Sequence, residues 1–452
     1  MTKETALTGR AREHLFSRVA SMRNIENAAP RVEATDAKGP QSRFTDFTTL
    51  PGYDELRLQR TVAEKMGLEN PFFRSHDARI GARTQMDGRT LINFSGYDYL
   101  GLNAHPEVAA AAKSAIDRYG ISASASRVVA GERPVHRDLE RALATHYGCE
   151  ESVVFVSGYS TNVSVIGQLV SAKDLVIYDA AIHNSVVVGS VLSGAPRRSF
   201  LHNDLDNLEQ ILGSVRNKFE RVLIVVEGIY SMDGDFPDLP RLIELKKRYN
   251  AWLMVDEAHA LGVLGRRGYG LFEHFGTDPR DVDIWMGTLS KTLAGCGGYI
   301  AGSATLVDYL RCMAGGFVYS VGMPPPIAAS VLKALEIMHR EPERVTALQK
   351  NGAYFLNYAK SKNLDTGSGG GTAVTPIVVG DSIAAVILSQ ELNHRGINVQ
   401  PVIYPAVPPK SARLRFFITT AHSRQDIEIA VDTMVEEIAK LPERVQAMKT
   451  LV

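Results

Sequence analysis

The chain has 452 residues, a length that predicts two or three folding units and not one small core. Lys plus Arg and Asp plus Glu number 50 each, so the net charge is zero, which argues against nucleic acid or an anionic membrane as a partner. The 3 cysteines lack C-x-x-C spacing, and no signal core or apolar run of about 18 residues occurs, so we expect neither disulfides nor a membrane span but a cytoplasmic protein.

The first hundred residues divide into two segments by composition. Residues 1–50 are polar and rich in Ala, Pro, Gly and Ser, which predicts a flexible N-terminal arm with one short helix near residues 10–22. Residues 51–100 are expected to pack on the smaller domain or on a dimer partner, with two short helical pieces between Tyr53 and Met66.

Residues 101–340 alternate between short apolar runs and helical patterns. Pro106 opens one helix and Gly120 closes it, while Val135, Leu139 and Leu143 recur at the spacing of a second. Strands are predicted at residues 152–156, 175–178, 222–226, 252–255 and 282–286, with helices from residues 161 and 184 and over 239–249. This alternation predicts an α/β fold, in which a large domain has a mainly parallel sheet covered by helices on both faces.

Residues 341–452 have a different pattern of predicted helices and strands. We predict a helix over residues 340–359, a Gly/Ser loop over 365–372, strands over 373–379 and 413–418, and helices over 383–395 and 424–440. The pattern indicates a smaller, C-terminal α+β domain.

Two residues at predicted strand ends suggest the chemistry. Asp256 ends the strand at 252–255, and Lys291 follows the strand at 282–286 in a segment rich in small and hydroxyl residues. Most lysines are solvated surface charges, and an aspartate at a strand end often caps a helix. A lysine and an acid at neighbouring strand ends also match what pyridoxal phosphate (PLP) needs: an amine for a Schiff base and a carboxylate that keeps the pyridine nitrogen protonated.

Other segments fit the same hypothesis, each beside a plainer interpretation. His183 follows a strand and could stack on a flat cofactor or simply cap a helix. The segment with Gly158 and Tyr159 could bind phosphate at a helix start or be an ordinary turn. Arg415 alternates with apolar residues on a strand and could clamp a carboxylate or form a surface ion pair. The histidines lack the close spacing of ligand motifs, so no metal site is expected.

Taken together, these segments resemble the α-oxoamine synthase family of fold-type I PLP enzymes, over about residues 70–440. The motifs that carry the resemblance are 98–102 (DYLGL), 126–140 around Ser126-Arg127, 202–204 (HND), 227–235 (EGIYSMDGD), 255–259 (VDEAH), 287–291 (GTLSK), 405–408 (PAVP) and 412–415 (ARLR). The resemblance implies a homodimer that condenses an amino acid with an acyl thioester, carried by coenzyme A or an acyl carrier protein. Loss of CO2 would then give an α-amino ketone.

The resemblance also implies roles for individual residues. Lys291 would bind PLP and remove the Cα proton, with Asp256 at the ring nitrogen, His183 on the ring and His259 at the ring hydroxyl. The remaining expected cofactor contacts are Gly158, Tyr159, Ser231, Thr288 and Ser290. Arg415 would bind the substrate carboxylate.

Two positions depart from the pattern of the aminolevulinate synthases and bear on the substrate. Tyr97 stands where many members have Asn, and Ser126 stands where those glycine-specific enzymes have Thr. The smaller Ser126 favours alanine or serine beside glycine as the amino acid. Details near Tyr97 and at residues 318–322 look most like members associated with polyketide assembly, which favours a carrier-protein donor. A peripheral membrane contact is expected only if the acyl chain is long.

Three other functions compete with this interpretation. An aminotransferase on the same fold would release a keto acid and need an amino acceptor. A non-catalytic partner subunit would lack the lysine, which is present here. A dinucleotide-binding oxidoreductase is disfavoured because the glycines at 295–298 lack the required spacing.

Overall fold

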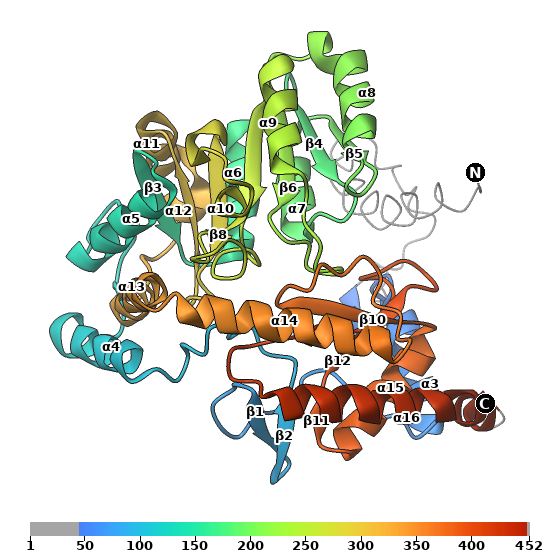
Figure 1. The fold of residues 1–452 in the computed structure, drawn as a ribbon. Coiled ribbons are helices and arrows are strands. Elements are labelled where there is room, and N and C mark those ends of the chain that lie inside the picture. Colours follow the sequence, from blue (N-terminus) through green and yellow to red (C-terminus); the bar gives the residue numbers. More distant parts are fainter. Residues whose placement is uncertain (1–44, 450–452) are drawn as a thin grey trace, which may run out of the picture. The chain divides into compact units, whose positions relative to one another are not determined.

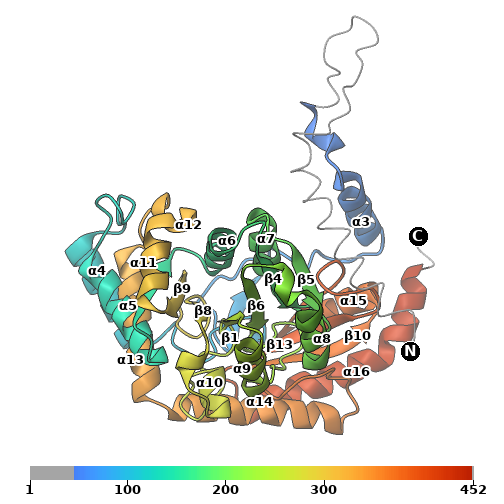
Figure 2. The same ribbon diagram turned by 90° about the horizontal axis from the view of Figure 1, so that it is seen from above.

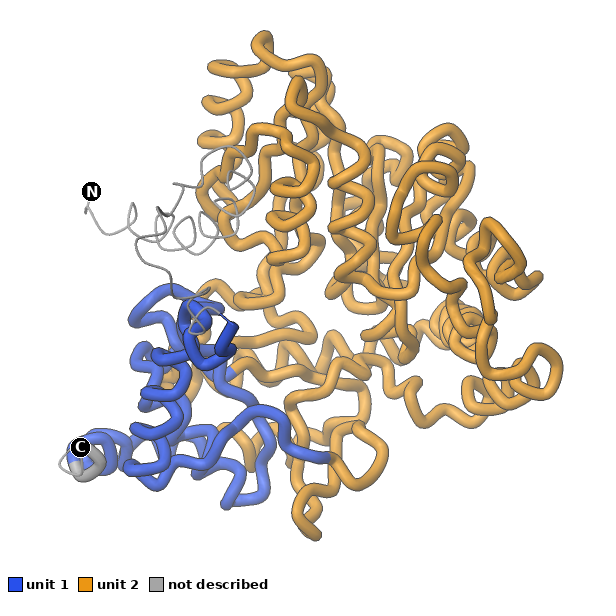
Figure 3. Tube along the Cα trace, turned by 180° about the vertical axis from the view of Figure 1, so that it is seen from behind, with its two compact units in different colours: residues 1–75, 378–414, 432–452 blue, residues 76–377, 415–431 orange. Residues whose placement is uncertain are grey.

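The computed structural model describes residues 45–449, so the predicted helix near residues 10–22 and most of the expected arm lie outside the described residues. The chain divides into two compact units (Figure 3). Unit 1 contains residues 1–75, 378–414 and 432–452, and unit 2 contains residues 76–377 and 415–431. This division by compactness does not follow the expected domain boundary at residue 340, which stays a prediction.

A seven-stranded sheet forms the centre of unit 2. Its strand order is β3 (Glu151–Phe155), β9 (Gly298–Gly302), β8 (Ile284–Thr288), β7 (Trp252–Asp256), β6 (Val222–Glu227), β4 (Leu175–Asp179) and β5 (Arg197–Phe200). The strands from β8 to β5 pair in parallel, whereas β9 pairs antiparallel with both β8 and β3. The predicted mainly parallel sheet is therefore confirmed.

Helices cover both faces of this sheet. Figure 2 shows α6 (Gly158–Leu169) and α7 (Asn184–Leu192) on one face and α9 (Leu239–Arg248) and α10 (Leu271–Phe275) on the other. Because both faces are covered, every residue of β6 is buried, as expected for a continuous apolar run in a parallel sheet.

The other helices of unit 2 include those predicted from residue 106, around residues 135–143 and over 340–359, the last with a correction at its start. They are α4 (Pro106–Tyr119), α5 (Pro134–Tyr147), α8 (Leu205–Val215), α11 (Ala304–Met313), α12 (Gly315–Val318), α13 (Pro325–Arg340) and α14 (Glu343–Ser361), labelled in Figure 1. Gly120 ends α4 at positive φ, as the sequence predicts, and Gly148 ends α5 in the same way. The helix expected over residues 340–359 is wrong at its start, because Arg340 ends α13 and Pro342 precedes α14.

Unit 1 combines the N-terminal segment with the C-terminal part of the chain. One continuous helix, α3 (Tyr53–Lys65), replaces the two helical pieces predicted there. The backbone N–H of Glu69 donates to Gln390 of α15 (Ser382–His394), so this segment contacts the C-terminal region of the chain. The short strand β11 (Ile397–Asn398) follows α15.

Three further elements contribute residues to both units: β10 (Val374–Gly380), β13 (Ala412–Phe417) and α16 (Arg424–Lys449). β10, β13 and β12 (Gln400–Val402) form a three-stranded sheet in that order. In unit 2, β1 (Arg83–Met86) and β2 (Arg89–Asn93) form an antiparallel hairpin. No helix among the described residues is long and apolar enough to cross a membrane.

Candidate active site

The carboxyl ends of β6, β7 and β8 bring the proposed chemistry together within unit 2. Glu227 at the end of β6 lies in register with Asp256 at the end of β7, and Asp256 lies in register with Met286 of β8. Lys291 follows β8 by three residues. The lysine and the acid thus follow neighbouring parallel strands, where the Asp256 carboxylate acts to raise the pKa of the Lys291 amine.

Two donors hold the buried carboxylate of Asp256, which is 4% exposed. Asn162 of α6 donates its Nδ2–H to Oδ2 at 2.9 Å, and the backbone N–H of Ala258 donates to Oδ1 at 3.0 Å. Asn162 also donates to Ser185 Oγ at 2.9 Å. These bonds fix the orientation of a charged group that would otherwise be costly to bury.

The Lys291 amine shares this environment. Burial lowers the pKa of Lys291 to about 8, although the carboxylates of Asp256 and Glu227 act in the opposite direction. Burial raises the pKa of Glu227 to about 8, and the nearby Asp256 adds to that rise. The amine lies 5.9 Å from the centre of the Tyr97 ring. A lysine that titrates near neutral pH can act as a nucleophile and as a base.

His183 and His259 lie near Asp256 and Lys291, one exposed and one buried. His183 precedes α7 as its N-cap, and its Nδ1 lies 2.7 Å from Ser185 Oγ, so the helix-capping interpretation is correct. The residue as a whole is exposed, whereas burial of its ring lowers the pKa of His183. His259 is buried, and its Nδ1 lies 2.7 Å from the hydroxyl of Tyr99. Burial holds the pKa of His259 well below its ordinary value, so this ring is neutral.

The start of α6 and the end of β8 form a cradle in which Gly158, which has no side chain, lies against Thr288. A Cβ on Gly158 would lie 2.7 Å from Thr288 Oγ1, closer than real Cβ atoms approach. Thr288 Oγ1 lies 2.8 Å from Ser290 Oγ and donates to the Gly297 carbonyl at 3.1 Å. Hydroxyls beside a helix N-terminus are suited to a phosphate, and this cradle, with the buried Asp256 and Lys291, fits PLP.

We predict that Gly158→Ala weakens PLP binding by roughly 10-fold or more, because each 1.4 kcal/mol of strain is a factor of ten. The added methyl would push against Thr288 at the phosphate position. Equilibrium titration of the apoprotein with PLP, followed by absorbance, measures the effect. Gly167→Ala in the same helix is the control, because its Cβ would meet no atom closer than 3.8 Å. Equal affinity in the two variants would contradict the assignment.

Arg415 of β13 contacts Ser231, in the loop after β6. Arg415 Nη1 donates to the Ser231 carbonyl at 2.9 Å, and its guanidinium lies 4.7 Å from the Phe417 ring centre. Ser231 is buried, and its N–H donates to Glu227 Oε2 at 3.2 Å. The Arg415 charge reaches both Lys291 and His259, so the arginine faces the same cluster.

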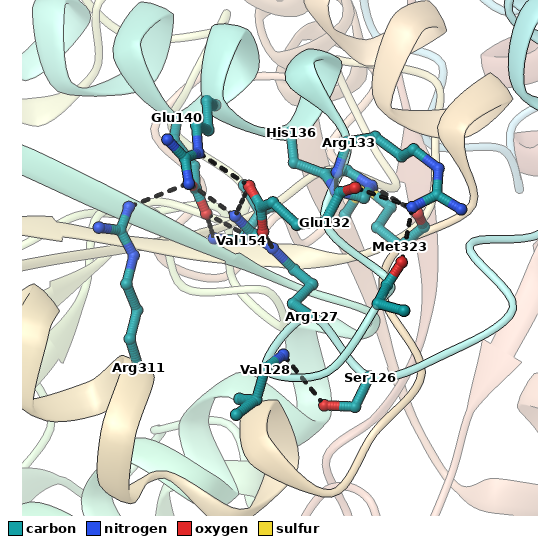
Figure 4. Close-up of polar contacts among 12 residues, drawn as sticks. Ser126, Arg127, Val128, Glu132, Arg133, His136, Glu140, Val154, Arg311 and Met323 are labelled. Atoms are coloured by element: carbon teal, nitrogen blue, oxygen red, sulfur yellow. Dashed lines mark hydrogen bonds and ion pairs between the residues drawn. The ribbon is translucent and has the colours of Figure 1, made fainter.

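Tyr97, Tyr159 and Ser126 are the last three expected site residues, and their surroundings differ from one another. Tyr97 is 40% exposed and packs its ring edge-on against Phe417 at 4.7 Å, beside Lys291. Tyr159 is also exposed and lies edge-on to His183 at 6.3 Å. Ser126 belongs to another cluster, in which its hydroxyl accepts from the Val128 N–H at 3.3 Å (Figure 4). The same hydroxyl donates to the Val318 carbonyl at 2.7 Å. Among the described residues, the Ser126 hydroxyl bonds Val318 and Val128 and not Lys291, so its role stays a prediction.

Two residues that hold the site were not predicted. Asn162 lies one helical turn after Gly158, and Tyr99 lies in the motif at residues 98–102. Each acts by hydrogen-bonding a residue that the sequence did single out. In the sequence, Asn162 precedes Val165 and Ile166 by three and four residues, so it shares their helix face. A polar residue on a buried face needs a hydrogen-bond partner, and this was the one signal for Asn162.

Comparison with known proteins agrees with this geometry. Residues 89–434 match the family model described as "Aminotransferase class I and II". An 8-amino-7-oxononanoate synthase of Symbiobacterium thermophilum is 38% identical over 390 residues, covering 86% of this chain and 96% of the relative. The 4-hydroxy-2,2'-bipyrrole-5-methanol synthase PigH of a Serratia species is 39% identical over 347 residues, covering 77% of this chain and 53% of the relative.

The fold is also similar to that of solved serine palmitoyltransferases. A serine palmitoyltransferase from S. paucimobilis, in a structure with PLP bound together with myriocin, has a TM-score of 0.84 at 26% identity and covers 88% of this chain and 99% of its own. A Sphingomonas wittichii serine palmitoyltransferase has a TM-score of 0.83 at 28% identity, with the same coverage. The chain therefore belongs to the α-oxoamine synthases, PLP-dependent acyltransferases built on the aminotransferase class I and II fold.

Proposed function

We propose that this enzyme, which condenses an amino acid with an acyl thioester, uses alanine, serine or glycine and releases CO2 to give an α-amino ketone. Bound PLP supplies an electron sink for the substrate Cα. The observation that carries the proposal is the cluster of the buried Asp256 with the partly buried Lys291 and Arg415, which provides a fixed negative charge, an amine and a cation for a substrate carboxylate. Within it, Lys291 would attach PLP and move the Cα proton.

The remaining residues would position the cofactor and the substrate. Gly158, Tyr159, Thr288 and Ser290 would hold the phosphate, and Ser231 would line the cofactor site. His183 would lie on the ring and His259 would contact the ring hydroxyl. Tyr97 and Ser126 would border the substrate, and the small Ser126 side chain leaves room for a substituent on Cα. The acyl donor would be a coenzyme A thioester or an acyl carrier protein.

We also propose that the enzyme is a homodimer. Val129 and Tyr319 are 82% and 89% exposed, and their segments are joined by the hydrogen bond from the Gly322 N–H to the Ala125 carbonyl. Ile121, Val128 and Val321 of the same segments are exposed as well. Large apolar side chains gathered on a surface in this way favour contact with another protein chain.

A product assay tests the proposed reaction. With L-alanine, L-serine or glycine and an acyl-coenzyme A, we expect stoichiometric release of free thiol, CO2 and an α-amino ketone, which mass spectrometry identifies. Parallel reactions with the matching acyl carrier protein thioester rank the two donors. Formation of a keto acid without thiol release would replace the proposal by the aminotransferase alternative. Absence of any product with bound PLP would favour a non-catalytic partner subunit.

A further inference from the structure

His202 connects three neighbouring strand ends of the sheet. It follows β5, and its Nδ1 lies 2.8 Å from Asp179 Oδ1 at the end of β4. Its Nε2 lies 3.0 Å from Asp235 Oδ2, in the loop after β6. Neither the PLP contacts nor the proposed substrate contacts include this histidine.

The two contacts define the charge of the ring. Because ionised carboxylates only accept hydrogen bonds, both ring nitrogens must carry hydrogen, and His202 is an imidazolium. Burial alone would lower its pKa, but the hydrogen bonds to Asp179 and Asp235 raise the pKa of His202 to about 10. The neighbouring Asn203 supports the same two carboxylates, through its N–H to Asp179 at 2.8 Å and its side chain to Asp235 at 3.0 Å.

The loop held by Asp235 carries Ser231, which contacts Arg415. The Tyr230 N–H donates to the Asp235 carbonyl at 2.8 Å, which closes residues 230–235 into one compact turn. Ser231 lies inside this turn, and its carbonyl accepts from Arg415. On the other side of the turn, Gly234 has φ +74 and a Cβ there would meet the Val374 carbonyl at 2.0 Å. Residues 230–235 are therefore held on one side by the bonds of Asp235 to His202 and Asn203, and on the other by the Val374 backbone.

We propose that His202 is a positioning residue, which clamps the loop after β6 to the end of β4 and so orients Arg415 toward the substrate carboxylate. The inference rests on the proposed function of Arg415. The same clamp fixes Asp179, which lies four residues before His183, so the two loops that border the cofactor would keep their spacing. His202 would act through Ser231 and Arg415 without touching the substrate.

The test combines substrate binding with stability in the PLP-loaded protein. In His202→Gln, which carries no charge and cannot donate from two ring nitrogens, we expect the dissociation constant for L-alanine, L-serine or glycine to rise by roughly 10- to 100-fold. Spectral titration measures it. Asp235→Asn should have a similar effect, and the double variant should be no worse than either single one, because both break one network. Equal binding by wild type and His202→Gln would overturn the proposal.

A second measurement does not depend on the substrate. The pKa of His202 is raised from 6.5 in the unfolded chain to about 10, so its stabilisation is fully present below pH 6.5 and is lost as pH rises toward 10. The stability difference between wild type and His202→Gln in urea should therefore shrink over that range. A pH-independent difference would overturn the clamp. If the wild type responds to none of the three amino acids, the proposed function fails while this comparison still decides the clamp.

His146→Gln is the matched control. His146 of α5 is buried, and its Nδ1 lies 2.9 Å from Nε2 of His339 on α13, so it belongs to a different pair from the His202 network. Burial lowers the pKa of His146 to about 3, so it is neutral across the same pH range. This variant should lose stability without a change in amino-acid affinity. A matching loss of affinity in His146→Gln would show that general destabilisation, and not positioning, explains the effect.

Discussion

Lys291→Ala should bind PLP only non-covalently, so that borohydride reduction fixes no cofactor to the protein, and turnover should fall by roughly 10³-fold or more. Lys291 is the amine that the site places beside Asp256 and Glu227. Its loss removes both the point of covalent attachment and the proposed base. Mass spectrometry of the reduced protein locates the label, and thiol release measures turnover.

The pH dependence of attachment follows from the same amine. Because the pKa of Lys291 is lowered to about 8, the neutral, nucleophilic form increases as pH rises through that value. The rate at which PLP attaches to the wild-type apoprotein should increase as pH rises through about 8 and level off above that value. Lys173→Ala is the control, because Lys173 is an exposed residue paired with Glu220. Undiminished labelling in Lys291→Ala would locate the attachment elsewhere and remove the basis of the proposed chemistry.

The sequence predicted the site best where an apolar run identifies a buried strand and a polar residue follows the end of that strand. Val222–Val226 is apolar enough to be a strand buried on both faces, and parallel strands place their carboxyl ends at one edge, so Asp256 and Lys291 could be placed together. The orientation of β9 could not be predicted, because Tyr299-Ile300-Ala301 has the same apolar pattern in either direction. Pairing direction depends on the path of the intervening chain, which periodicity does not encode.

Other features depended on packing between distant segments. The helix predicted from Arg340 starts three residues later, at Glu343, because Arg340 completes α13 and Pro342 stands at the N-cap of α14. Asn162 and Asp256 are 94 positions apart, and their hydrogen bond exists only once α6 covers β7. The motif containing His202 was evident in the sequence, but its two carboxylate partners come from two other strand ends.

Asp256→Asn should keep PLP attached to Lys291 but lower turnover by roughly 10²- to 10⁴-fold, the range for loss of a positioned proton-transfer group. Asparagine presents one oxygen and one NH2, whereas Asp256 accepts from Asn162 on one oxygen and from Ala258 on the other. One of these donors would then face another donor. The variant also loses the negative charge that a protonated pyridine nitrogen needs.

The electrostatics give this variant a second, independent signature. Asp256 raises the pKa of Lys291, so without its charge the amine pKa should fall below about 8, and the pH midpoint for PLP attachment should move to lower pH. Asp174→Asn is the control, because Asp174 is also buried and accepts two backbone N–H groups, at Ser171 and Arg221, but lies before β4. That variant should be less stable with an unchanged midpoint. Turnover near the wild-type level in Asp256→Asn would mean that the carboxylate serves only to hold α6 and β7 together, and the charge at the ring nitrogen would have to come from another residue.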